Sequence, residues 1–208
     1  MMWEKLAPYL ETYYNQYDGS HDMAHIERVY ENADRLLNHY PEANRHLVTF
    51  AVGLHDVEDK KYATENSAAF MAYIFETFAI SPEEQLKIRT IIEQVSFSGG
   101  AQADSLEAQI VQDADRLDAI GAVGIARTFA FGGAKNRKLY NHKEVEAYWD
   151  GQPLKNGSSV THFYEKLLKL KELMNTEQAR QMAEDRHQFM ELFLNQLYEE
   201  VGNQPCRN

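Results

Sequence analysis

Apolar residues recur every three or four positions along most of this chain, which is the spacing of a buried face on an amphipathic helix. The predicted helices cover residues 3–14, 22–38, 41–56, 67–78, 83–95, 111–127, 161–174 and 177–200. The clearest start signal is Ser81-Pro82-Glu83-Glu84, where Ser81 suits the N-cap, Pro82 the first turn and Glu84 a reciprocal capping hydrogen bond. No segment alternates as a strand does, so the sequence predicts an all-α fold.

Two other features shape this outline. Ser20 or Asp22 suits the N-cap of the second helix, and Pro41 is predicted to start the third. Residues 132–160 are rich in Gly and Pro and are predicted to be irregular; loops that long are usually functional or disordered. The chain is therefore predicted to be a single domain, with a core at about 19–130, a loop at about 132–160 and C-terminal helices at about 161–200.

Length and charge exclude several classes of function. With 208 residues the chain is long enough to bury a stable core without covalent cross-links. Cys206 is its single cysteine, which rules out an intrachain disulfide or a cysteine metal site. Its 21 basic and 32 acidic residues give a formal charge of −11, which disfavours a nucleic acid polymer as partner. We expect no membrane association and a cytoplasmic location, because no stretch reaches the ~20 apolar residues of a span and the N-terminus lacks a signal pattern.

Candidate chemistry centres on residues 111–127, where Asp115 lies in an apolar, helix-like run and is predicted to point toward packed interior. A carboxylate there needs a partner. The best candidates elsewhere are His25 and the adjacent pair His55-Asp56. Two imidazoles and two carboxylates suit a divalent ion of hard or borderline character, so we expect a metal site built from three helices.

The order of these residues carries a family resemblance. His25 in SHDMAHIERV, then His55-Asp56, then Asp115 in DADRLDAIGAVGIARTFAFGG resembles the H…HD…D signature of the HD-domain superfamily of metal-dependent phosphohydrolases, and in particular its single-domain bacterial members. HFYEKLLKLKELMNTEQARQMAEDRHQFM is similar to the C-terminal helices of that group. The resemblance implies a helical bundle with additional C-terminal helices, and a divalent metal held by the four residues of the signature.

The implied activity is hydrolysis of a phosphoester or phosphoanhydride bond in a small phosphorylated metabolite, most simply a nucleotide. Four protein ligands leave two positions on a six-coordinate ion, so we expect Mn²⁺ or Mg²⁺, while Fe²⁺, Co²⁺ and Ni²⁺ also fit. The alternative is a non-catalytic, metal-bound module that senses a nucleotide. Metal-dependent product release distinguishes the two.

Further site residues are expected near this signature. Glu58 and Asp59 follow the HD pair and are candidates to accept a proton from the attacking water; the alternative is a solvated turn. His21, Arg28 and Lys135 are the expected phosphate-binding side chains, with Lys135 heading a basic run after Gly-Gly that suits a mobile loop; the alternative is a solubilising loop. Apolar residues on 177–200 fit either core packing or a homodimer surface.

Overall fold

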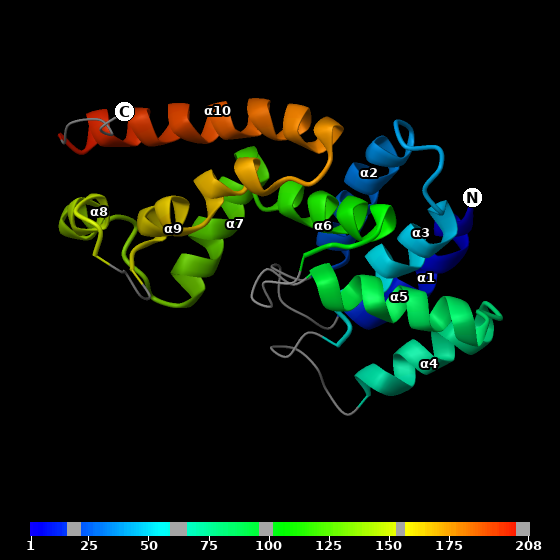
Figure 1. Cartoon of the computed structure of the whole chain (residues 1–208). Coiled ribbons are helices and arrows are strands. Elements are labelled where there is room, and N and C mark those ends of the chain that lie inside the picture. The colour runs from blue at the N-terminus through cyan, green and yellow to red at the C-terminus, as the bar shows by residue number, and fades with distance from the viewer. Residues whose placement is uncertain (16–21, 59–65, 96–101, 153–156, 203–208) are drawn as a thin grey trace. The chain divides into compact units, whose positions relative to one another are not determined.

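The computed structural model of the protein describes residues 1–15, 22–58, 66–95, 102–152 and 157–202, and all regular structure within these ranges is helical (Figure 1). The predicted all-α fold is therefore confirmed. The helices are α1 (Met2–Tyr14), α2 (Met23–Leu37), α3 (Arg45–Leu54), α4 (Ser67–Thr77), α5 (Pro82–Val95), α6 (Leu106–Asp118), α7 (Gly121–Ala134), α8 (His142–Trp149), α9 (Ser159–Glu165) and α10 (Glu177–Glu200), with short 3₁₀ turns η2 (Leu167–Lys169) and η3 (Lys171–Leu173). None of these helices combines the length and the apolar character that crossing a bilayer requires.

Contacts group the chain into two compact units, residues 1–115 and residues 116–208. The first ends within α6, so this helix begins in one unit and ends in the other. The single-domain organisation stays a prediction.

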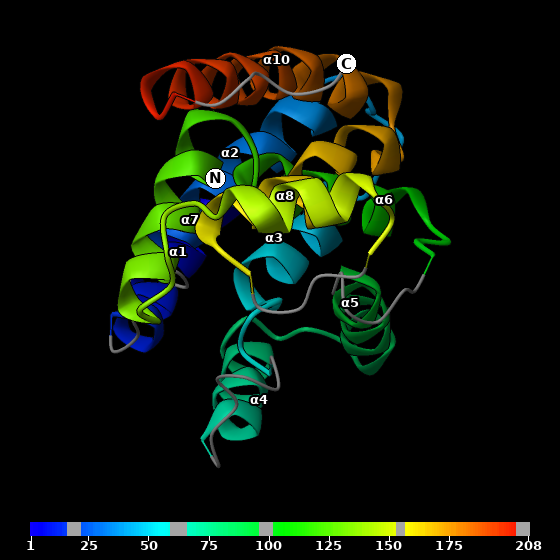
Figure 2. The ribbon, with the colours of Figure 1, turned by 90° about the vertical axis from the view of Figure 1, so that its left-hand side faces the viewer.

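In the first unit α3 is the central helix, and it packs against α1, α2 and α5 (Figure 2). Every residue from Leu47 to Leu54 is buried. The approach of α1 is close, because a Cβ on Gly53 would lie 2.9 Å from Leu10 Cδ1, and the Tyr14 hydroxyl donates to the Gly53 carbonyl at 3.0 Å. The end of α3, where the HD pair begins, is thus held inside the core.

Helix starts in this unit follow the predicted capping chemistry in two places out of three. Asp22 caps α2, and Ser81 and Glu84 form the predicted reciprocal capping box at α5. The predicted start at Pro41 is wrong, because α3 begins at Arg45. Asn44 provides the reason: its side chain accepts hydrogen bonds from the backbone N–H groups of His46 and Leu47 and so satisfies the first turn.

Residues 111–127 form two helices, and not the single run that the sequence suggested. The break falls at Ala119-Ile120, and α7 starts at Gly121 with φ of +75°. This left-handed conformation is open to glycine at little cost, and a Cβ at Gly124 would lie 2.2 Å from the Ala119 carbonyl oxygen. The glycines in the sequence AIGAVG therefore permit a tight turn that an apolar periodicity alone does not reveal.

In the second unit α7 packs against α10 and α9, and α8 packs against α9. Two predictions are wrong here. Residues 132–160 contain α8 as well as the end of α7, and residues 161–174 form α9 followed by η2 and η3 instead of one helix. Apolar residues three apart, such as Leu167 and Leu170, suit a 3₁₀ turn as well as an α-helix, so spacing could not separate them. The prediction for 177–200 is confirmed by α10.

Candidate metal centre

His25 is placed by the start of α2. Its backbone N–H donates to the Asp22 side chain at 2.9 Å, which caps the helix and fixes the first turn. The His25 side chain is only 2% exposed. A polar ring this deep in the core needs polar neighbours, and two carboxylates supply them.

His55 and Asp56 come directly after α3. The His55 ring places Nδ1 2.8 Å from the Val52 carbonyl oxygen, a contact that requires the proton on Nδ1 and leaves the lone pair on Nε2. That Nε2 atom is buried and has no hydrogen-bond partner among the described residues. The Asp56 side chain beside it is 11% exposed.

Asp115 reaches the same point from α6. Its Oδ1 atom lies 3.6 Å from His25 Nε2 and 3.9 Å from His55 Nε2. The side chain is 33% exposed, so the expectation that it points into packed interior is wrong; Asp113, two residues earlier, is fully buried. The helix turns Asp115 toward the edge of the core, where solvent reaches the cluster.

The four side chains form one compact group, and the ligand atoms of three of them lie close enough together to share an ion. His25 Nε2 lies 3.4 Å from Asp56 Oδ2, and His55 Nε2 lies 3.5 Å from Asp56 Oδ1. The ligand atoms of His25, His55 and Asp56 all fall within 4.8 Å of one another. Ligands around an ion with bonds of about 2.1 Å stand about 3 to 3.5 Å apart. A buried, unpartnered imidazole nitrogen facing carboxylates fits a metal ligand better than it fits a packed core.

Asn32 supports the metal centre, and the sequence analysis did not identify it. Asn32 lies on α2 seven residues after His25, hence on the same helix face, and is 4% exposed. Its side-chain N–H group donates to the carbonyl of Ala114 at 3.1 Å, next to Asp115. A polar residue two turns from His25 within an otherwise apolar stripe was the available signal. Through it, the α2 helix holds the α6 backbone at the position from which Asp115 projects.

The other expected site residues have different outcomes. Glu58 is 37% exposed, and its Oε2 accepts a hydrogen bond from Arg89 of α5 at 3.0 Å, a partner that the sequence did not indicate. Arg28 is half-buried on α2. His21 and Asp59 lie outside the described residues.

Lys135 lies in the second unit and is exposed, with its Nζ 5.8 Å from the centre of the Phe131 ring. Lys135 caps α7, and the next residues are hydrogen-bonded to that helix, while the expected mobility of this loop stays a prediction. Asp118, adjacent in sequence to the cluster, accepts a hydrogen bond from Arg127.

The all-α fold and the H…HD…D constellation define the class, and the chain belongs to the HD-domain family, whose model matches residues 23–120. A curated relative, YpgQ of Bacillus subtilis, is 34% identical over 206 residues, which cover 95% of this chain and 93% of YpgQ. An HD-superfamily hydrolase from Bacillus thuringiensis is 38% identical, with a TM-score of 0.75 over 98% of each chain. The crystal structure of B. subtilis YpgQ in complex with ADP gives a TM-score of 0.74 at 34% identity, over 94% of this chain and 97% of that one.

Proposed function

We propose that this protein is a divalent-metal-dependent phosphohydrolase that cleaves a phosphoester or phosphoanhydride bond in a small phosphorylated metabolite, specifically a nucleotide. Membership of the HD-domain family supports a hydrolase. The observation that carries the metal dependence is the convergence of His25, His55, Asp56 and Asp115 around a buried, unpartnered His55 Nε2.

In the proposed site all four of these residues hold the ion. The two neutral imidazoles offer nitrogen lone pairs, and the two carboxylates together carry a charge of −2, which balances a divalent cation. The Val52 carbonyl keeps His55 in the required tautomer. A bound divalent ion would supply positive charge beside the phosphoryl oxygens and would acidify water at the site. Mn²⁺ or Mg²⁺ is the proposed ion, on the ground that mixed nitrogen and oxygen ligands with free positions suit either.

The chain's own side chains would bind the phosphates and move the proton. Arg28, one turn after His25 on α2, is a proposed phosphate ligand together with His21. Lys135, in the second unit, is the third side chain proposed to bind phosphate. Glu58 and Asp59 are the proposed proton acceptors, because they lie just beyond the HD pair, after Val57. A nucleotide is favoured as substrate by the ADP complex of the B. subtilis relative.

The test is product release from a nucleotide panel by metal-stripped protein, after Mn²⁺, Mg²⁺, Co²⁺, Ni²⁺, Fe²⁺ or Zn²⁺ is added back. We expect turnover to return with Mn²⁺ or Mg²⁺ and to be lost in Asp115→Ala. Asp104→Ala is the matched control, since Asp104 is an exposed carboxylate just before α6, and it should retain activity. Stoichiometric binding of metal and nucleotide with no product for any nucleotide would overturn the hydrolase and establish the sensing module.

A further inference from the structure

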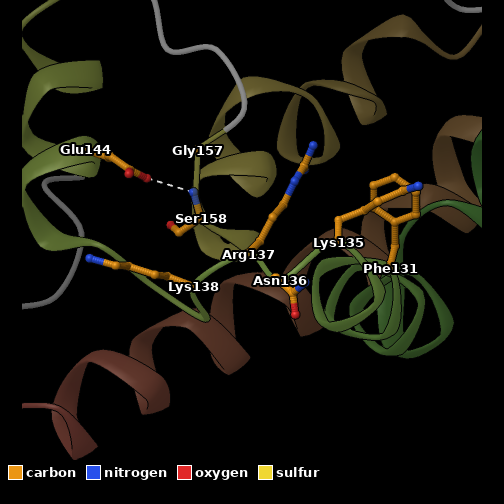
Figure 3. A pocket seen from close by; sticks show the side chains of 8 residues that line it. All are labelled: Phe131, Lys135, Asn136, Arg137, Lys138, Glu144, Gly157 and Ser158. Carbon is orange, nitrogen blue, oxygen red and sulfur yellow. Dashed lines mark hydrogen bonds between the residues drawn. The ribbon is translucent and has the colours of Figure 1, made fainter.

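A pocket of about 530 Å³ opens in the second unit, where α7 ends and the segment before α9 passes the start of α8. Figure 3 shows its walls from close by. It is lined by Phe131, Lys135, Asn136, Arg137, Lys138, Glu144, Gly157 and Ser158. Its volume lies within the range of about 300–1,000 Å³ that is usual for small-molecule sites.

Positive charge gathers around this pocket. Lys135, Arg137 and Lys138 contribute three cations against the single carboxylate of Glu144. Within the described ranges none of these three forms an ion pair, whereas elsewhere Lys87 pairs with Glu83 and Arg89 with Glu58. In a chain with a formal charge of −11, three neighbouring cations repel one another. The carboxylate of Glu165 interacts electrostatically with Arg137 and offsets only part of this charge, so a bound anion would relieve the remaining repulsion.

The backbone beneath these cations is fixed by a helix-ending motif. Asn136 has φ of +53°, the Arg137 N–H donates to the Gly132 carbonyl at 2.8 Å, and the Asn136 N–H donates to the Gly133 carbonyl at 3.1 Å. This is the pattern of a Schellman motif. The backbone that follows is also held by a hydrogen bond, since the Ser159 N–H donates to the Lys138 carbonyl at 2.9 Å. Because the run is already ordered, a ligand would not have to order it.

Glu144 forms the opposite wall of the pocket, and its carboxylate already accepts hydrogen bonds from the protein itself. Burial raises its pKa, but hydrogen bonds from Ser158, Thr161 and Asn141 outweigh burial and hold the pKa of Glu144 below its ordinary value. Figure 3 shows the bond from the Ser158 N–H group to this carboxylate. The Glu144 carboxylate therefore anchors the segment before α9, and within the described residues it forms no ion pair with the three cations.

We propose that this pocket binds the phosphate groups of a small polyanion, either free pyrophosphate or the phosphate chain of a nucleotide. A ligand of several negative charges matches three cations better than a singly charged carboxylate does, and the planar guanidinium of Arg137 suits two phosphate oxygens at once. The inference shares Lys135 with the proposed function and extends phosphate binding to Arg137 and Lys138. It rests on the residues that line the pocket and not on the metal cluster, so it can be tested without turnover.

The experiment is calorimetric titration of the full chain with inorganic pyrophosphate, and separately with ADP, in EDTA and at low salt. The protein carries Asp115→Ala so that the metal cluster is disabled. Lys138→Ala and Arg137→Gln are the test variants. Lys143→Ala is the matched control, because Lys143 is exposed in the same basic stretch and does not line the pocket. Circular dichroism checks that each variant is folded.

Binding in the Asp115→Ala background that weakens about tenfold or more in both test variants, and less than twofold in Lys143→Ala, is the expected result. Equal affinity for the two ligands assigns the pocket to phosphate alone, and tighter ADP binding assigns it to a nucleotide. The proposal is overturned if pyrophosphate and ADP fail to bind, or bind equally well to Lys138→Ala and its parent. Neither negative result touches the proposed hydrolysis, which is judged by product release from metal-loaded wild type.

Discussion

At the scale of single residues, the metal centre depends on what surrounds each ligand. His55 illustrates this: the carbonyl of Val52 fixes the proton on Nδ1, so the buried Nε2 atom presents a lone pair toward Asp56 and Asp115. His25 gains its place from a capped helix start, and Asn32 holds the backbone next to Asp115. The ligand set therefore extends to partners that hold each ligand in its required state.

Glu58 provides a residue-scale prediction. If it accepts the proton from attacking water, Glu58→Gln should lower kcat about 10²-fold while metal content stays at the wild-type level. If Glu58 only forms its exposed ion pair with Arg89, kcat should not change, because such a pair takes no part in the proton transfer and contributes little to stability. Glu83→Gln is the control, since Glu83 forms a comparable exposed pair with Lys87. Steady-state kinetics with metal analysis separates the two roles, and an unchanged kcat removes Glu58 from the mechanism.

At the scale of elements, backbone breaks decide where side chains are presented. The turn between α6 and α7 ends the helix that carries Asp115 and redirects the chain, and the Schellman motif at the end of α7 does the same for the basic run. Both depend on a residue with positive φ: Gly121 in the first case and Asn136 in the second. Apolar periodicity continues through such breaks, which is why residues 111–127 resembled one helix.

The turn can be tested through its glycine. Gly121→Ala should destabilise the protein by about 1–2 kcal/mol, because alanine at φ of +75° is strained and its Cβ would lie 3.0 Å from the side chain of Arg186. Gly133→Ala in α7 is the control; its Cβ meets nothing within 4 Å, so the change should be neutral or stabilising. Urea unfolding measures both. Equal stability of the two variants would show that the turn does not require glycine.

At the scale of the whole molecule, acid sensitivity follows from a half-buried histidine, His162, far from the ligand set in sequence. Burial, with the charges of Lys166 and Arg137, lowers the pKa of His162 from 6.5 to about 4. Between these values the unfolded chain binds a proton that the folded protein does not. His162 therefore makes the free energy of unfolding fall as pH drops from 6.5 toward 4, and its effect is complete below about 4.

Replacing this histidine should flatten that part of the stability curve. His162→Asn is expected to lower the slope of unfolding free energy against pH between about 4 and 6.5, whatever its effect at neutral pH. His142→Asn is the control for removing a more exposed histidine, since its side chain is 39% exposed. Denaturant unfolding across this pH range measures the slope. An unchanged slope in His162→Asn would contradict the assignment.

Local sequence alone determined the helical class, the Ser81 cap, the helix at 177–200 and the choice of His25, His55, Asp56 and Asp115 as a group, and it narrowed the cap of α2 to Ser20 or Asp22. These follow from short-range chemistry: capping and periodicity act within a turn or two, and histidine and carboxylate ligands are recognisable by type. The resemblance to the HD-domain family then connected these four residues through the order in which they occur along the chain.

Tertiary structure alone decided how those residues are used. It set the start of α3 at Arg45, divided 111–127, introduced α8, and paired Glu58 with Arg89. It also brought Lys135, Arg137 and Lys138 to the wall of one pocket. Each outcome depends on partners distant in sequence or on backbone angles that residue type only permits, and the burial of His55 Nε2 beside Asp115 is the case on which the proposed chemistry rests.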